Sequence, residues 1–391
     1  MGENFFHLLG EVEAVFLFWT AALVVVMWCM TGWRATVEFV DKTDYTEPLF
    51  VFAIMAMAAT RPVVDLAAAL IRAVARMLPL PGMMSFVLSA LVVGPLLGSL
   101  ITEPAAMTVT AMILLRQVMQ RNVSQNLRYA IVGVLFVNVS IGGTLTHYAA
   151  PPVVMVASKW GWGTGFMFGA FGWKAACAAV INAVGVLLLF KRELSALELL
   201  ADSDEHAEGA AKMSAPLWVG VVHALALTFV VTNAHHPKVF LGGFVLFLGF
   251  LAATKEYQEP LKLRESLLVG GFLGGLVTLG SFQRWWLEPL VQSLDTTTLY
   301  WGATGLTAIT DNAALTFLGS QVGDLSEPMK YALVAGAVTG GGLTVIANAP
   351  NPAGNSLLGP SFGDEGLSPV LLCKWAFLPT LVAAGSFLLL H

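Results

Sequence analysis

The chain has 391 residues, 57% of them hydrophobic and only 12% charged, and its mean hydropathy is +0.76. Because soluble globular domains carry about 25% charged residues, this composition excludes an ordinary soluble fold and predicts an all-α polytopic membrane protein surrounded by lipid. The net charge of −5 says little by itself, and no lysine-rich tail indicates a nucleic-acid partner.

The first half of the chain, residues 1–190, is predicted to be an N-terminal membrane repeat. Its first span covers residues 15–32, and we expect that span to be retained, because the acidic stretch before it lacks the basic segment of a signal peptide. Residues 49–60 and 63–77 are also apolar. The Thr-Arg-Pro interruption between them leaves two interpretations open, two short spans or one kinked span.

An acidic motif follows the next apolar segment. Residues 83–101 lead into Thr-Glu-Pro-Ala-Ala-Met-Thr at 102–108, which places Glu103 inside an apolar region. Pro104 disfavours helix before it, so we expect a turn at this point and a return of residues 105–115 beside the first arm. The sequence therefore predicts a re-entrant helical hairpin with a carboxylate at its tip. An ionisable residue at membrane depth is a functional-site hypothesis by default.

A second irregular segment lies further along. Residues 129–146 form the next predicted helix, which a run of Gly, Thr and Pro breaks at 142–152. Non-helical backbone at membrane depth is tolerated where it is buried in protein or lines a cavity, so the break is a candidate ion site. Residues 166–190 complete the repeat. The polar, acidic stretch 191–213 is predicted to be a flexible cytoplasmic linker between two membrane domains.

The C-terminal membrane repeat, residues 214–391, follows the same order. Its motif Thr-Asp-Asn-Ala-Ala-Leu-Thr at 310–316 places Asp311 where the first repeat has Glu103. Four glycines in one of its spans suit close helix packing. We expect nine to eleven membrane segments in the whole chain. The segments predicted in this half are 215–231, 240–253, 267–279, 285–306, 331–342 with a break at 343–354, and 369–390.

Four matches in the same order reveal the internal repeat. The two acidic motifs are 208 positions apart, and the Gly-Gly-x-Leu-Thr-x-x-Ala pattern of the two breaks recurs after 198 positions. Ala58-Ala59-Thr60-Arg61 matches Ala252-Ala253-Thr254-Lys255. Lys174 and Lys374 are 200 positions apart. Internal repeats of this kind are a signature of secondary transporters.

The positive charges predict the orientation of the repeats. The positive-inside rule assigns the open end of the first hairpin to the cytoplasm. Each half then has five crossings, an odd number, so the two halves are expected to be inverted relative to each other. The arginines at that open end are Arg72, Arg76, Arg116, Arg121 and Arg128.

Three stretches together resemble a family of sodium/proton antiporters of bacterial inner membranes. They are the string from Asn138 to Pro152, the motif at 102–108, and Phe171-Gly172-Trp173-Lys174. More distantly, the breaks resemble those of the ion transporter superfamily, which includes sodium/proton antiporters, arsenite transporters and sodium-coupled dicarboxylate carriers. The resemblance implies two inverted repeats, each with a re-entrant hairpin and an unwound helix, a homodimer, and sodium bound at tips and breaks. Many sodium-coupled members have neutral tips, so the acids here favour a cation or proton over an anionic substrate.

Oxygen atoms from tips and breaks are the expected ligands of the transported ion. A buried carboxylate holds either a proton or a cation, and this competition suffices for antiport. Sodium and protons would be the transported species, and no cofactor is expected. The candidate ion-binding and proton-coupling residues are Glu103, Asp311, Thr102, Thr108, Asn138, Thr144, Thr146, His147, Thr310, Asn312, Thr316, Thr344, Asn348 and Asn351.

The candidates differ in weight. Asp311 is the stronger of the two acids, because Asn312 beside it supplies another oxygen, whereas Pro104 beside Glu103 indicates a partly structural turn. Both acids have an alternative role as helix caps, and threonines in membrane helices often only bond the backbone. His147 is either a satisfied polar residue or a proton relay. Lys174 and Lys374 either act as counter-charges to the tips or extend to the membrane interface.

Two other functions remain as alternatives. A sodium-coupled dicarboxylate or arsenite-type transporter would use the same fold. An intramembrane enzyme is the alternative from another class, since residues 359–363 fit the pattern Gly-x-Ser-x-Gly. A nucleophile elbow, however, needs a strand before it and a helix after it, and we expect neither in this Pro/Gly loop.

Overall fold

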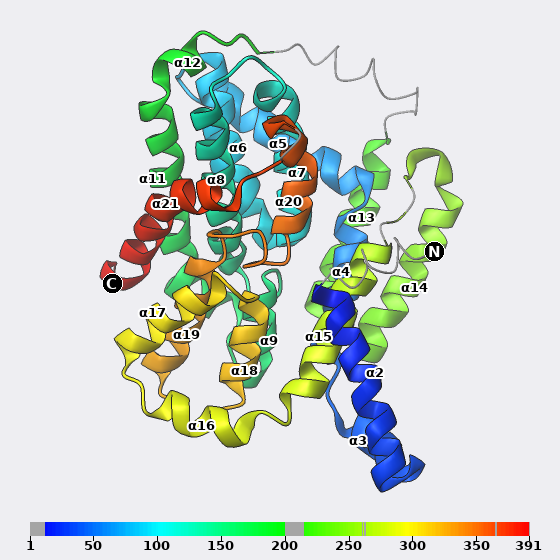
Figure 1. Ribbon diagram of the computed structural model, residues 1–391. Helices are drawn as coiled ribbons and strands as arrows, with labels where there is room; N and C mark the ends of the chain where they lie inside the picture. Colours follow the sequence, from blue (N-terminus) through cyan, green and yellow to red (C-terminus); the bar gives the residue numbers. More distant parts are fainter. Residues whose placement is uncertain (1–11, 200–214, 260, 262, 364–365, 391) are drawn as a thin grey trace.

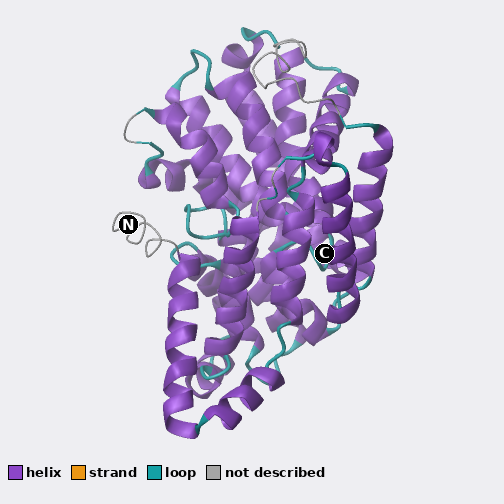
Figure 2. Cartoon of the chain, turned by 90° about the vertical axis from the view of Figure 1, so that its right-hand side faces the viewer, coloured by secondary structure: helices purple, strands orange, loops and turns teal. Residues whose placement is uncertain are grey.

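The computed structural model describes residues 12–199, 215–259, 261, 263–363 and 366–390. All regular elements in these ranges are helices, which confirms the all-α prediction (Figure 2). Six of them are long and apolar enough to cross a membrane, so the protein is a multi-pass membrane protein. These six are Ala14–Thr31, Gly82–Ile101, Gln125–Leu145, Thr164–Leu189, Leu263–Gly280 and Pro369–Leu389.

The remaining apolar segments are shorter than a full span. Helices α4 (Thr46–Ala58) and α5 (Arg61–Met77) are bent by 70° at the predicted interruption, and they count as one broken span if taken together. Helices α13 (Leu217–Thr232) and α14 (Pro237–Ala253) have 16 and 17 residues. The expected nine to eleven segments therefore exceed the six that meet the length requirement in the described residues, because several apolar runs form short helices.

One group of helices, here called the peripheral bundle, lies on the right of Figure 1. In it α15 (Leu263–Gly280) packs against α2 (Val12–Thr31) and α4, and α13 and α14 also pack against α4. A Cβ on Gly275 would lie 2.7 Å from Thr20 Oγ1, so this glycine permits close approach of α15 and α2, as expected from the sequence. Amphipathic α3 (Trp33–Lys42) folds back on α2.

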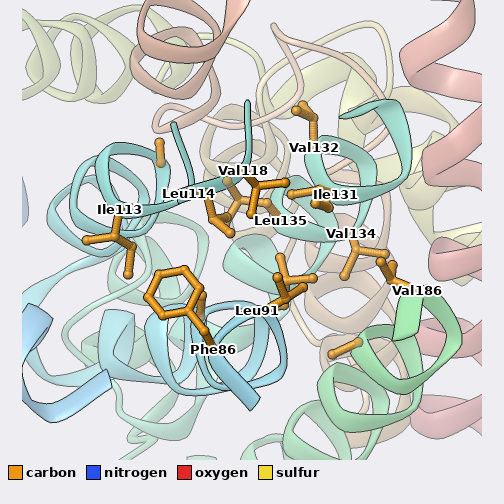
Figure 3. Close-up of a cluster of buried hydrophobic side chains, with 14 of the residues drawn as sticks. Phe86, Leu91, Ile113, Leu114, Val118, Ile131, Val132, Val134, Leu135 and Val186 are labelled. Atoms are coloured by element: carbon orange, nitrogen blue, oxygen red, sulfur yellow. The ribbon is translucent and has the colours of Figure 1, made fainter. Parts of the chain in front are cut away.

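The other group, the central bundle, surrounds α8 (Gln125–Gly142). Helices α6 (Gly82–Ile101), α11 (Trp173–Leu189), α19 (Glu327–Gly340) and α21 (Pro369–Leu389) all contact α8. Figure 3 shows the apolar packing that fixes it: Leu91, Leu135 and Val186 come from three of these helices and belong to one buried cluster. A Cβ on Gly133 would lie 2.9 Å from the backbone of α21, so α8 and α21 touch at main-chain distance.

Two helix pairs and two breaks lie in the central bundle. Helix α6 ends at Ile101 and α7 (Glu103–Leu114) begins two residues later and packs on it. Helix α17 (Thr296–Thr307) is likewise followed by α18 (Asn312–Ser320). The predicted breaks are present: α8 is followed by η2 (Gly143–Leu145) and α9 (Pro151–Trp160), and α19 by an irregular segment and α20 (Asn351–Leu358).

Two predicted membrane segments differ from their expected boundaries. The segment 285–306 is divided into α16 (Arg284–Gln292) and α17, because the Asp295 carboxylate caps α17 at the Thr298 amide, 2.8 Å away. The segment 166–190 contains a π-helix, η3 (Phe168–Gly172), between α10 (Thr164–Met167) and α11.

The linker also differs where it is described. Its first residues form α12 (Lys191–Ser195), in which Leu194 is buried and Glu193 accepts a hydrogen bond from the Ser124 hydroxyl at 2.9 Å. The linker therefore does not begin as a flexible segment at residue 191. Residues 200–214, which carry most of its acids, lie outside the described residues.

Candidate functional site

Two adjacent residues of the second break connect the two acidic motifs. The Asn348 side chain donates from Nδ2 to Glu103 Oε2 over 3.0 Å, and the Ala347 carbonyl accepts from the Asn312 amide over 3.2 Å. Residues from both halves thus meet at one point. Asp311 lies close enough to Glu103 to act on it electrostatically.

The first tip holds Glu103 in a tight, fully buried position. Thr102 joins α6 to α7 with φ +74° and ψ 149°, a region reserved almost entirely for glycine, at a cost of about 1–3 kcal/mol. Glu103 is 0% exposed and makes no capping hydrogen bond. Gly143 of the first break makes room for it, since a Cβ there would lie 2.3 Å from Glu103 Oε1. The Glu103 carboxyl therefore lies between residues of both breaks.

The second tip uses its acid differently. Asp311 is the N-cap residue of α18, and its Oδ1 accepts from the amides of Ala313 and Ala314 at 2.8 and 3.0 Å. It is half-buried and lines a cavity. Asp311 therefore has a capping role that Glu103 does not have.

Several buried polar atoms around the tips have no hydrogen-bond partner among the described residues. A buried unsatisfied polar group costs about 1–3 kcal/mol, so such a group calls for an explanation. Among the predicted site residues, five of these atoms are oxygens, which are the ligands that hard cations prefer. They are Thr102 Oγ1, Glu103 Oε1, Asn312 Oδ1, Asn348 Oδ1 and Asn351 Oδ1.

A cavity of about 2210 Å³ reaches both tips. Pro104 and Thr108 of the first tip, Asp311 of the second and Asn348 of the break are on its wall. Both bundles contribute to it, since α15 of the peripheral bundle and α7 and α18 of the central bundle supply lining residues. Besides Asp311, its charged lining residues are Arg61, Asp65, Arg72, Arg116, Glu259, Arg264 and Glu265.

Most of the predicted threonines bond the backbone. Thr102 is the one predicted threonine whose hydroxyl is buried without a partner among the described residues. The other hydroxyls retain lone pairs for a ligand but have a structural use in helix ends and breaks. They donate as follows: Thr108 to Pro104 O, Thr144 to Ile141 O, Thr146 to Ser99 O, Thr310 to Leu306 O, Thr316 to Ala313 O and Thr344 to Ala308 O.

The amides divide into two groups. Asn138 donates to Leu91 O and Ala179 O and accepts from Asn182, so its side chain is fully used in helix packing. Asn351 donates to the carbonyls of Gly341 and Thr344 at 2.7 and 2.8 Å, which leaves its oxygen available. The structure thus connects Asn312, Asn348 and Asn351 to the tips and breaks but gives Asn138 a packing role.

The two lysines are not placed as counter-charges to the tips. Lys174 donates to the Tyr331 hydroxyl over 3.1 Å and lies 4.9 Å from the centre of that ring, an arrangement typical of a cation–π contact. Lys374 is exposed. The sequence could not distinguish this arrangement because both lysines share the repeat offset, which carries no information on side-chain direction.

His147 lies away from the carboxyl groups, in the first break. Its Nδ1 is 2.8 Å from the Thr164 hydroxyl, and its ring stacks on His235 with centroids 6.2 Å apart. Neither His147 nor His235 lines the cavity at the tips.

Sequence reasoning missed two serines and a glycine. Ser99 donates to Gly142 O at 2.7 Å and accepts from the Leu145 amide at 2.9 Å, so it ties α6 to the first break. Ser140 donates to Val338 O across the two halves at 2.7 Å. Gly143, which accommodates Glu103, lay within the recognised motif. Ser99 has no comparable signal, because it stands alone in an apolar helix.

Over residues 1–390 the sequence matches the protein family described as "Putative Na+/H+ antiporter". The chain belongs to this family. No curated protein matches it. The family is one of transporters and not of enzymes, and the six apolar helices agree with a membrane transporter. The Gly-x-Ser-x-Gly pattern agrees with this conclusion, since it lies in η6 (Gly359–Phe362) after helix α20 and not after a strand.

Proposed function

We propose that the protein exchanges sodium for protons by alternating access, with Glu103 as the group that holds either ion. The observation that carries the proposal is the hydrogen bond from Asn348 to Glu103, which brings a buried carboxyl and an unwound segment of the other half together. A proton on Glu103 removes its charge, and sodium replaces that proton at the same oxygens.

The oxygens with no partner complete the proposed cation shell. Thr102, Asn312, Asn348 and Asn351 each place one such atom in or beside the tips and breaks. Asp311 contributes negative charge from the cavity wall while it caps α18. The scheme also includes secondary ligands or proton carriers, which are the remaining predicted threonines, the unwound carbonyls and His147. Sodium and protons are cargo in this scheme, and it includes no cofactor.

The proposal includes two inverted repeats with re-entrant hairpins, α6–α7 and α17–α18. Reciprocal packing supports it: α7 of the first half packs on α20 of the second, and α18 of the second packs on α9 of the first. Ser140 and Val338, which bond to each other, are also counterparts at the repeat offset of 198. A residue that contacts its own counterpart lies beside a two-fold axis. We place the protein as a dimer in the bacterial inner membrane, with the arginine-rich end of the first hairpin in the cytoplasm.

One observation favours a second candidate, cotransport of sodium with an organic anion. The cavity is much larger than a sodium ion requires, and four arginines are on its wall. A carboxylate-bearing substrate would pair with these arginines. Four acids on the same wall, among them Asp311, balance their charge, so we rank this candidate below antiport.

Proteoliposomes with a set pH gradient test the proposal and separate the two candidates. Antiport predicts that external sodium releases protons from the vesicles and that Glu103→Gln abolishes this release. Dicarboxylates should have no effect. Sodium-dependent dicarboxylate uptake without proton movement would establish the second candidate instead.

Site-directed labelling tests the inverted repeats separately. Single cysteines at Asn122 and Gln125 should react only from the cytoplasmic side, and those at Gly323 and Ser326 only from the opposite side. Reaction of both pairs from one side would exclude the inverted arrangement.

A further inference from the structure

Helix α16 crosses the end of the molecule opposite α12 and joins α15 of the peripheral bundle to α17 of the central bundle (Figure 1). Four apolar residues on this helix and just after it have the i, i+3, i+4, i+7 spacing of a single helix face. All four line the cavity that reaches the two tips, so an apolar face of α16 bounds this cavity at one end. They are Leu287, Leu290, Val291 and Leu294.

The two ends of the cavity differ in chemistry. At the α16 end, Leu287 belongs to a buried apolar cluster with Leu299 of α17 and Val322 of the loop after α18. At the other end, the wall carries charged side chains from α5, from α15 and from the residues that follow α7, among them the exposed Arg116 and Glu265. Water and ions enter more readily at the charged end, because apolar surface disfavours contact with water.

A polar contact, here called the latch, fastens α16 to the loop between α18 and α19. Glu288 Oε1 of α16 accepts from the Gly323 amide of that loop over 3.2 Å. Arg284, one turn earlier, donates from Nε to Glu288 Oε2 over 2.9 Å and from Nη2 to Oε1 over 3.2 Å, which orients the carboxylate. A Cβ on Gly323 would lie 3.0 Å from Glu288 Oε1, so the loop and the helix meet closely at this point.

We propose that α16 is the outer lid of the cavity and that Glu288, by holding the Gly323 amide, is the positioning residue that keeps this lid closed. The inference rests on the proposed alternating access and orientation, in which the charged end of the cavity faces the cytoplasm and α16 lies on the outer side. Because α16 is part of the chain between the two bundles, it must shift when one bundle moves relative to the other. Release of the latch lets the apolar face of α16 leave the wall, which opens the tips to the outside.

Thiol accessibility tests the inference without any ion flux. The three native cysteines, Cys29, Cys177 and Cys373, are replaced by serine. One cysteine is then introduced by Leu315→Cys, at a position of α18 on the cavity wall. A membrane-impermeant thiol reagent is applied to the full-length protein in proteoliposomes from one side at a time. We expect fast reaction from the cytoplasmic side and slow reaction from outside, because α16 closes the outer end.

Variants of the latch identify what keeps the lid closed. Glu288→Ala removes the acceptor of the Gly323 amide, and the loss of one charge-assisted hydrogen bond should raise the outside labelling rate about tenfold. Gly323→Ala disturbs the same contact from the loop and should raise the rate as well. The matched control is Glu327→Ala, which removes an exposed carboxylate that pairs with Lys330 of its own helix and should keep the parental rate.

The outcomes separate the lid from the antiport proposal. Fast outside labelling of the parent, an unchanged rate in both latch variants, or an equal rise in the Glu327→Ala control overturns the lid. Because labelling needs neither sodium nor a pH gradient, such a failure leaves the antiport proposal intact. Conversely, parental exchange in Glu103→Gln together with the expected labelling would exclude the antiport mechanism and leave the lid in place.

Discussion

The two tips are copies in sequence but not in structure. At the first tip the N-cap position of α7 is Thr102, so Glu103 falls one residue inside the helix and its carboxyl is free of capping bonds. At the second tip the acid itself is the N-cap of α18. Pro104 has no amide hydrogen, whereas its counterpart Asn312 donates one to Ala347. A shift of one residue in the helix start thus decides the role of the acid. Glu103 lies inside its helix without a capping bond, whereas Asp311 caps its helix.

The largest effect is expected at the first tip. Glu103→Gln keeps the size of the side chain and one oxygen that can accept from Asn348, but it removes the charge for which sodium and the proton are proposed to compete. Sodium-dependent proton release from proteoliposomes should fall to the level of empty vesicles, while the purified variant keeps the unfolding temperature of the parent. Exchange at the parental rate would mean that the buried acid has no part in coupling.

The next effect should come from the glycine that accommodates Glu103. In Gly143→Ala the new Cβ would lie 2.3 Å from Glu103 Oε1, so the carboxyl must move. Overpacking costs about 1–3 kcal/mol, which predicts a loss of roughly tenfold to a hundredfold in apparent sodium affinity, measured as the sodium dependence of proton release. Gly185→Ala is the matched control, since nothing lies within 4 Å of a Cβ there. Equal affinities in both variants would contradict the position given to Glu103.

A smaller effect is expected at the second tip, where the loss of sodium affinity can be measured separately from the loss of stability. Asparagine is as good an N-cap as aspartate, so Asp311→Asn should weaken sodium affinity and leave stability nearly unchanged. Asp311→Ala should show the same transport defect and lose about 1 kcal/mol of stability in addition, measured by thermal unfolding in detergent. Abolished exchange in Asp311→Asn, with Glu103→Gln still active, would restore Asp311 as the principal acid.

The smallest effect is expected from the lysines. Lys174 is engaged by Tyr331 and Lys374 is exposed, so Lys174→Met and Lys374→Met should leave the pH dependence of exchange unchanged, even if Lys174→Met lowers the amount of folded protein. The pH profile is the decisive measurement. A shifted profile in either variant would indicate long-range coupling to the tips that the observed contacts do not provide.

The fold was predictable wherever local chemistry decides the backbone. Paired glycines and prolines fixed the two breaks, and the apolar segments identified the long helices, because each signal depends on neighbouring residues only. The short lengths of α13 and α14, and the division before Asp295, escaped the same reasoning. There the tertiary packing and a capping carboxylate decide where a helix ends.

The sequence could nominate candidate site residues, but it could not predict how they are arranged. Glu103 and Asn348 were both expected because each lies in a repeated motif, yet no spacing shows that they are partners. Likewise, the left-handed backbone at Thr102 has no local signal, since threonine is a poor residue for that conformation. Sequence analysis gave both acids a capping alternative, but it could not tell which of them caps a helix, because a one-residue shift in the helix start depends on the whole turn.

The bond between Asn348 and Glu103 also has a consequence for biogenesis. The two residues are 245 positions apart, so at about 5–20 residues per second the ribosome needs roughly 12–50 s after Glu103 to synthesise its partner. Throughout that interval the nascent first half inserts with a carboxyl that has neither its amide donor nor a cation shell. Protonation of Glu103 during this interval would lower the free-energy cost of inserting the side chain into lipid. Translation must therefore finish almost completely before the proposed ion site can form.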